Sequence, residues 1–184
     1  MPAISNQGEV IELINHVRQA RQYDDTAVSD EQIRELLEVA RWTGSSRNTQ
    51  PWHFIAITDK DKLQAISQLR TPINWVASAP LAIAIVLDGE SDLSEAYDEG
   101  RVTERLMVAA HAMGLGGGIA WFGDEQQQAQ AKQILGIPED RTARSVVVIG
   151  HPTSVKDPRP NPAQAGRHPL SEIASLNTMG NSVG

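Results

Sequence analysis

Apolar residues recur at helical spacing in several stretches of the chain. Segments 10–17 and 33–40 each carry apolar side chains at positions i, i+3, i+4 and i+7, which predicts two amphipathic helices. Ser29 and Gln32 have the spacing of a capping box, so the second helix is predicted to begin there. Three further helices are predicted, over residues 61–69, 97–113 and 124–135.

Short apolar runs rich in β-branched residues predict four strands, over residues 53–58, 81–87, 119–122 and 145–149. Two helices precede the first strand, and helices and strands do not alternate strictly after it. The pattern therefore favours an α+β fold over a doubly wound parallel sheet. The 184 residues fit one domain, 1–184. The prolines between 152 and 162 predict an extended loop, and the polar end, 177–184, is expected to fray.

The charge balance and the absence of cysteine narrow the chemistry. With 16 lysines and arginines against 23 aspartates and glutamates, the surface is acidic and does not suit the phosphate backbone of nucleic acids. Without cysteine the chain has no disulfides or thiolate nucleophile, and the five histidines lack metal-ligand spacing, so redox chemistry would need a cofactor. No apolar run reaches the roughly 20 residues of a membrane span. We expect a cytoplasmic protein without a membrane or nucleic-acid partner.

A run of glycines separates the predicted helix 97–113 from the strand 119–122. A dinucleotide-binding fingerprint needs a strand before the glycines and a helix after them, whereas the order here is helix, glycines, strand. Two interpretations remain. Gly114 ends the helix in a left-handed conformation, or the following glycines let the backbone approach a planar ligand.

The segment Ser45-Ser-Arg-Asn-Thr-Gln-Pro-Trp-His-Phe54 joins a predicted helix to a predicted strand. It combines hydroxyls, a cation, amides and a large aromatic, and such junctions frequently carry binding residues. The alternative is a polar loop that Pro51 ends and Trp52 anchors in the core.

Two pairs of adjacent carboxylates, Asp24-Asp25 and Asp98-Glu99, raise the question of acid/base chemistry. Neighbouring residues on one element point in different directions and do not share a site. We interpret both pairs as charges at helix starts.

In their order along the chain, these motifs resemble the nitroreductase family. The resemblance covers residues from about 10 to 173. The matching motifs are Arg18, Arg21 and Tyr23; the S-S-x-N-x-Q-P-W-x-F loop from Ser45 to Phe54; Tyr97-Asp98-x-Gly100; Gly114-Leu-Gly116; Leu135-Gly-Ile-Pro138; Ile149-Gly-His-Pro152; and Arg167-x-Pro-Leu170.

The resemblance implies a sandwich with a central, mainly antiparallel sheet flanked by helices, in an intertwined homodimer with two FMN sites at the interface. It implies cofactor-binding roles for a basic segment near the phosphate and ribityl chain, a loop that edges the flavin, backbone near the isoalloxazine ring and a C-terminal arginine at the phosphate. In this sequence the matching residues are Arg18, Gln19 and Arg21; Ser45, Ser46, Asn48 and Gln50; Ala120 and Trp121; and Arg167.

The function implied is that of an FMN-dependent oxidoreductase. Hydride would pass from NAD(P)H through the flavin to a nitroaromatic, quinone or enone by a ping-pong mechanism. No side chain is expected to be catalytic, because the flavin carries the chemistry. The alternative is a non-catalytic protein on the same fold that binds a flavin or a deazaflavin.

One position departs from the family pattern. The basic segment usually reads Arg-Arg-Ser, and here it reads Val17-Arg18-Gln19. If residue 17 faces the phosphate, the site holds less positive charge than its relatives do. If Val17 instead completes the apolar face of segment 10–17, a charge there would be buried and costly.

Overall fold

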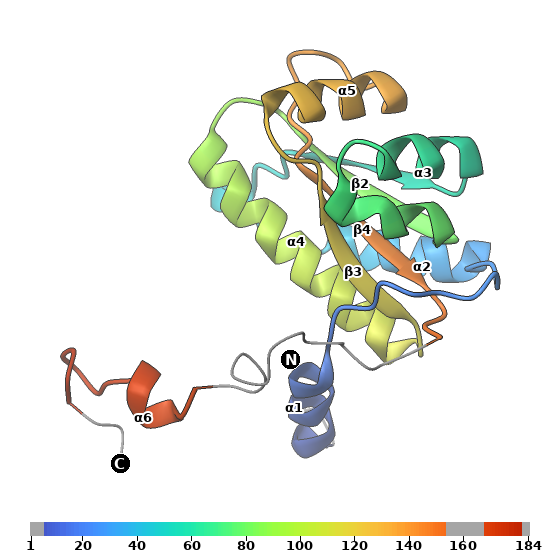
Figure 1. The fold of residues 1–184 in the computed structure, drawn as a ribbon. Coiled ribbons are helices and arrows are strands. Elements are labelled where there is room, and N and C mark those ends of the chain that lie inside the picture. Colours follow the sequence, from blue (N-terminus) through green and yellow to red (C-terminus); the bar gives the residue numbers. More distant parts are fainter. Residues whose placement is uncertain (1–5, 154–167, 182–184) are drawn as a thin grey trace.

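A four-stranded antiparallel sheet forms the centre of the fold (Figure 1), as seen in a computed structural model that describes residues 6–153 and 168–181. Its strands lie in the order β1-β2-β4-β3, so β1 and β3 are the two edges. The strands are β1 (Trp52–Ile57), β2 (Leu81–Leu87), β3 (Gly116–Trp121) and β4 (Ser145–Gly150). The predicted α+β class and mainly antiparallel sheet are confirmed.

Helices cover both faces of this sheet (Figure 1). The helices of the described residues are α1 (Gln7–His16), α2 (Asp30–Arg41), α3 (Lys60–Ser67), α4 (Asp92–Ala112), α5 (Glu125–Leu135) and α6 (Leu170–Ile173), with 3₁₀ segments η1 (Ser46–Asn48) and η2 (Thr71–Ser78). The α2 and α4 helices pack on one face, and α3, η2 and α5 pack on the other. Within the described ranges, no helix combines the length and the apolar character that a bilayer crossing requires.

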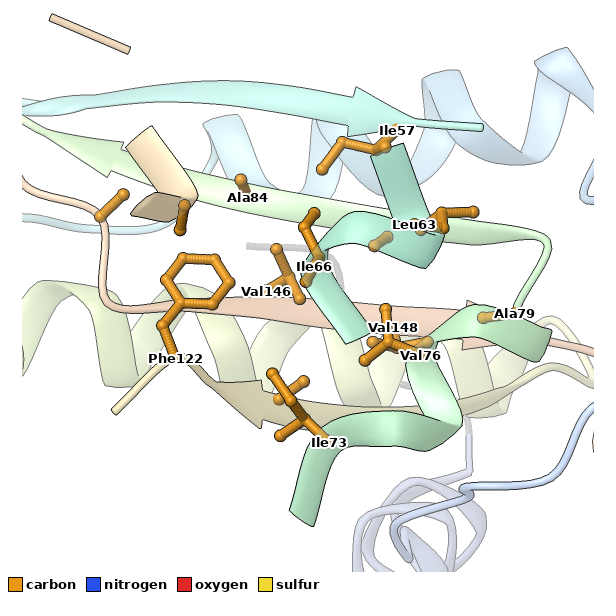
Figure 2. Packing of buried hydrophobic residues seen from close by; sticks show 14 of the residues in the cluster. Ile57, Leu63, Ile66, Ile73, Val76, Ala79, Ala84, Phe122, Val146 and Val148 are labelled. Atoms are coloured by element: carbon orange, nitrogen blue, oxygen red, sulfur yellow. The ribbon is translucent and has the colours of Figure 1, made fainter. Parts of the chain in front are cut away.

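The two faces are buried because β2 is apolar throughout and β4 carries a continuous apolar run after Ser145. Side chains alternate along β2, so Leu81, Ile83, Ile85 and Leu87 join the α2/α4 core while the intervening residues join the other. Figure 2 shows the second core, where Ile66 of α3 and Val76 of η2 lie close to Val146 and Val148 of β4. The resulting layers hold the edge strand β3 in place.

Local signals set the helix ends. Ser29 and Gln32 form the predicted capping box at the start of α2. Gly114 follows α4 with a φ of 74°, as the helix-end interpretation requires. A second capping box joins Asp124 and Gln127 at the start of α5, which Gly136 ends in a left-handed conformation.

The structure corrects two element starts. β3 begins at Gly116, three residues before the predicted start at 119, so its glycines belong to the strand. α4 begins at Asp92, five residues before the predicted start at 97. Asp98 and Glu99 therefore lie in its second turn and are buried, so the expectation that they are helix-start charges is wrong. The segments η1 and η2 carry no clear helical period and were not predicted.

Candidate functional site

Residues 18–23, called the basic segment below, run along the free edge of β3. The backbone N–H of Ala20 donates to the carbonyl of Gly117 at 2.7 Å, and Gln19 bridges Gly117 in parallel orientation. Further along, Tyr23 forms an antiparallel bridge with Pro152. The segment therefore extends the sheet beyond β3 at the end where that strand begins.

The glycines of β3 permit this close approach. A Cβ atom on Gly118 would lie 2.4 Å from the carbonyl oxygen of Ala20 and 3.0 Å from the ring of Trp75. Both distances are too short for a side chain to fit without movement of the backbone or the indole. The glycines thus make room for the chain's own basic segment and for Trp75. They lie in a strand that follows a helix, so they do not form a dinucleotide-binding turn.

The buried Tyr23 connects the basic segment to the sheet. Its hydroxyl donates to the carbonyl of Ala20 at 2.6 Å, and the carbonyl of Val148 in β4 lies 3.3 Å away. Burial raises the pKa of Tyr23 far above its usual value, and the positive charge of Arg21 opposes this rise only in part. The phenol thus remains a hydrogen-bond donor at physiological pH.

Arg18 and Arg21 stand exposed on this segment. Arg18 Nη1 donates to the carbonyls of Asn15 and Val17 at 2.6 and 2.7 Å, which closes the end of α1. The Arg21 guanidinium lies 5.9 Å from the ring centroid of Trp75. In the described part of the chain neither arginine forms an ion pair.

Val17 is partly buried and packs against the α2/α4 core, whereas Gln19 is exposed. The apolar interpretation of Val17 therefore agrees with its surroundings. A guanidinium at this position would have to leave the core or displace it.

Backbone groups of β3 face outward beyond the basic segment. Because Gly117 bonds outward to Ala20 and strand residues alternate, the N–H and carbonyl groups of Ile119 and Trp121 also point away from β4. Phe122 N donates to Arg144 O on the inner side, as this alternation requires. The Ala120 side chain is fully buried, and Trp121 exposes 53% of its surface.

The loop Ser45 to Gln50 lies at the opposite edge, immediately before β1. Ser45 Oγ accepts from Gln50 N at 2.8 Å, and Ser46 N donates to the buried Asp98 carboxylate at 3.4 Å. Arg47, Asn48 and Gln50 have φ angles of 51°, 57° and 51°, a region that side chains disfavour. Such strain concentrates at binding sites and is maintained by surrounding contacts.

Two other buried acidic residues of α4 bind the beginning of β4. Arg144, at the start of β4, pairs with Glu95 at 3.6 Å and with Glu99 at 3.3 Å. Ser145 Oγ donates to Glu99 at 2.6 Å. These residues connect α4 to the sheet, and sequence reasoning missed them because the partners lie more than forty positions apart.

One chain does not bring the two groups of predicted residues together. The strand order separates β1 from β3 by three strand spacings, roughly 14 Å. The pairing register also places Trp52 and Gly117 at opposite ends of the sheet. Within one chain, the loop 45–50 and the arginines of segment 18–21 are therefore too far apart to bind the same ligand. They could share a site only if a second chain supplied one of the two groups. Arg167, the predicted C-terminal phosphate ligand, lies outside the described residues.

Comparison with known proteins identifies relatives that cover most of the chain. The sequence model of the nitroreductase family matches residues 16–83. A protein of Archaeoglobus fulgidus named NADH dehydrogenase/NAD(P)H nitroreductase is 33% identical over 158 residues, which cover 81% of this chain and 88% of that protein.

Solved structures give the same result. An FMN-dependent nitroreductase from Clostridium difficile superposes with a TM-score of 0.75 at 27% identity, covering 79% of this chain and 89% of that one. A nitroreductase from Desulfovibrio desulfuricans, solved in complex with FMN, superposes with a TM-score of 0.77 at 26% identity, covering 94% and 98%.

Proposed function

This chain belongs to the nitroreductase family, and from that membership we propose that it is an FMN-dependent oxidoreductase that transfers hydride from NAD(P)H to an oxidised acceptor. The observation that carries the proposal is the arrangement along β3. Two arginines without carboxylate partners among the described residues lie at one end of the edge, and outward-facing backbone groups follow it.

These residues fit the parts of FMN in order. Arg18 and Arg21 supply guanidinium groups for the phosphate, and Gln19 lies between them for the ribityl hydroxyls. The backbone beside Ala120 and Trp121 offers donors and acceptors to the polar edge of the isoalloxazine ring. When bound, FMN would supply the hydride-carrying chemistry that none of the chain's side chains provides.

The remaining predicted residues require a second copy of the chain. We propose a homodimer in which Ser45, Ser46, Asn48 and Gln50 of one copy border the flavin held by the other. Its support is the separation of these groups within one chain and the large apolar surface left uncovered. Trp42 and Tyr97 are 68% and 72% exposed, and α1 contains no buried residue.

The chain's own part in the reaction is then binding, orientation and exclusion of water. An open site beside Trp121 would admit the reductant and the acceptor in turn, which predicts ping-pong kinetics. Nitroaromatics, quinones and enones are the acceptors proposed. A location in the cytoplasm remains a prediction.

The test is to release the ligand from purified protein, identify it by spectrum and mass, and follow its absorbance after anaerobic addition of NADH or NADPH. FMN that bleaches rapidly, and recovers when a nitroaromatic or quinone is added, supports the proposal. A bound flavin that neither reductant bleaches would favour the non-catalytic binding protein. Release of a deazaflavin in this experiment would show that a deazaflavin, and not FMN, is the cofactor.

A further inference from the structure

Arg70, which is partly buried, and Trp121, which is exposed, form a pair at the far end of β3 from the basic segment. The Arg70 guanidinium lies 5.2 Å from the indole centroid, and its Nη1 donates to the Trp121 carbonyl at 3.5 Å. The aliphatic part of Arg70 passes Gly123, where a Cβ atom would lie 3.5 Å from Arg70 Cδ. Stacking, a hydrogen bond and this contact together restrict where the cation can point.

In the described part of the chain, Arg70 has no acidic partner. Among residues 6–153 and 168–181, no carboxylate lies within ion-pairing distance of it. Asp124 follows Trp121 closely in the sequence, but its Oδ1 accepts a hydrogen bond from Gln127 N at 3.0 Å as part of the α5 capping box. A guanidinium has five N–H donors, and the carbonyl of Trp121 accepts from only one nitrogen.

We infer that Arg70, held on Trp121, binds an anionic oxygen group of the molecule that occupies the substrate site beside the proposed flavin. This inference rests on the proposed function, because the flavin defines that site. The group is a carboxylate or phosphate, which a guanidinium recognises through paired hydrogen bonds. Its two possible sources are the 2′-phosphate of NADPH and a carboxylate on the acceptor.

Position separates this role from that of the flavin phosphate. Arg21 stacks on Trp75, which contacts Gly118 near the start of β3, whereas Arg70 stacks on Trp121 at its end. If the flavin phosphate binds at Arg18 and Arg21, Arg70 remains for the anionic group of a different molecule.

The binding test uses Arg70→Gln, with Arg70→Lys to retain charge and Arg34→Gln as the matched control at an exposed arginine on α2. Benzoate and benzamide, which differ mainly in charge, are titrated calorimetrically into each protein with and without flavin. Wild type should prefer benzoate. Arg70→Gln should weaken benzoate binding roughly tenfold, the size expected for loss of a hydrogen bond to a charged group. The same variant should change benzamide binding less than about twofold, because benzamide carries no charge.

The kinetic arms distinguish the two sources by comparing kcat/KM for NADPH with NADH and for 4-nitrobenzoate with 4-nitrobenzamide. A selective loss with NADPH identifies its phosphate, and a selective loss with the nitrobenzoate identifies an acceptor carboxylate. Equal losses for charged and neutral ligands, or weaker FMN binding alone, would overturn the inference. Absence of bound flavin contradicts the proposed function instead, and the calorimetric comparison on flavin-free protein still decides whether Arg70 selects anions.

Discussion

The backbone N–H of Ala20 donates to the carbonyl of Gly117 at 2.7 Å, and this bond sets the segment that carries Arg18 and Arg21 against the edge of β3. The contact requires the small residue next in the strand, because Gly118 faces the carbonyl of Ala20. The proposed binding surface for the flavin phosphate thus depends on a glycine of the neighbouring strand.

Gly118→Ala should therefore impair both stability and flavin binding. Its new methyl group would overlap the Ala20 carbonyl and Trp75, which is expected to cost about 2 kcal/mol of unfolding free energy, typical of overpacking. Gly100→Ala in α4 is the control, because a Cβ atom there meets nothing within 4 Å and should stabilise the helix by about 0.5 to 1 kcal/mol. Chemical denaturation and FMN titration measure both effects. Unchanged FMN affinity in Gly118→Ala would contradict the account.

Tyr23→Phe should release the basic segment with little change in packing. Loss of the hydrogen bond to Ala20 is expected to cost about 1 kcal/mol at neutral pH and to weaken FMN binding. Chemical denaturation and FMN titration measure the two changes, and an FMN affinity equal to that of wild type would contradict this account.

The same variant predicts a specific dependence on pH. Because burial raises the pKa of Tyr23 in the folded protein, its phenol stabilises the fold fully below the unfolded pKa of about 10. That contribution is lost as the pH rises above 10, where only the unfolded chain ionises readily. Denaturation between neutral pH and pH 11 should show wild type losing its advantage over Tyr23→Phe. A constant difference across this range would contradict the role of the buried hydroxyl.

Val17→Arg should lower the melting temperature without tightening FMN binding, because Val17 packs against the α2/α4 core. We expect a loss of about 1 to 3 kcal/mol, as for a buried polar group without a partner. Gln19→Arg adds the same charge at an exposed position of the same segment and should leave the fold intact. Tighter FMN binding by Val17→Arg with an unchanged melt would show that residue 17 faces the phosphate.

Arg167→Ala tests the C-terminal phosphate ligand that the family resemblance implies. Binding of FMN should weaken by roughly 1.5 to 3 kcal/mol, the range for a hydrogen bond to a charged group. Arg34→Ala provides the comparison at an exposed arginine of α2. Equal flavin retention by both variants after dialysis would remove Arg167 from the site.

The sequence predicted the features that depend on local chemistry. The strand at 81–87 has its predicted bounds because its apolar run is continuous, and Ser29 starts α2 through its own side chain. The start of β3 was missed because glycine has low strand propensity, and its place in the sheet comes from pairing with β4.

The candidate residues were proposed from the sequence, but their arrangement could not be. The spacing of Arg18, Ser45 and Trp121 along the chain does not reveal that the loop and the basic segment lie at opposite edges of the sheet. Contacts such as Arg70 with Trp121, or Ser145 with Glu99, join distant positions and leave no periodic signal.

The shared site is tested most directly by mixing two defective chains. Arg21→Ala removes a cation from one half of the proposed site, and Asn48→Ala removes an amide from the other. In a dimer that contains one of each, one site combines both defects and the other has neither, so random assembly restores about a quarter of all sites. The measurement is the amount of flavin bleached by NAD(P)H in co-expressed protein, relative to wild type and to each variant alone. The account predicts recovery to about a quarter of wild type, and bleaching no greater than that of the two parent variants would contradict it.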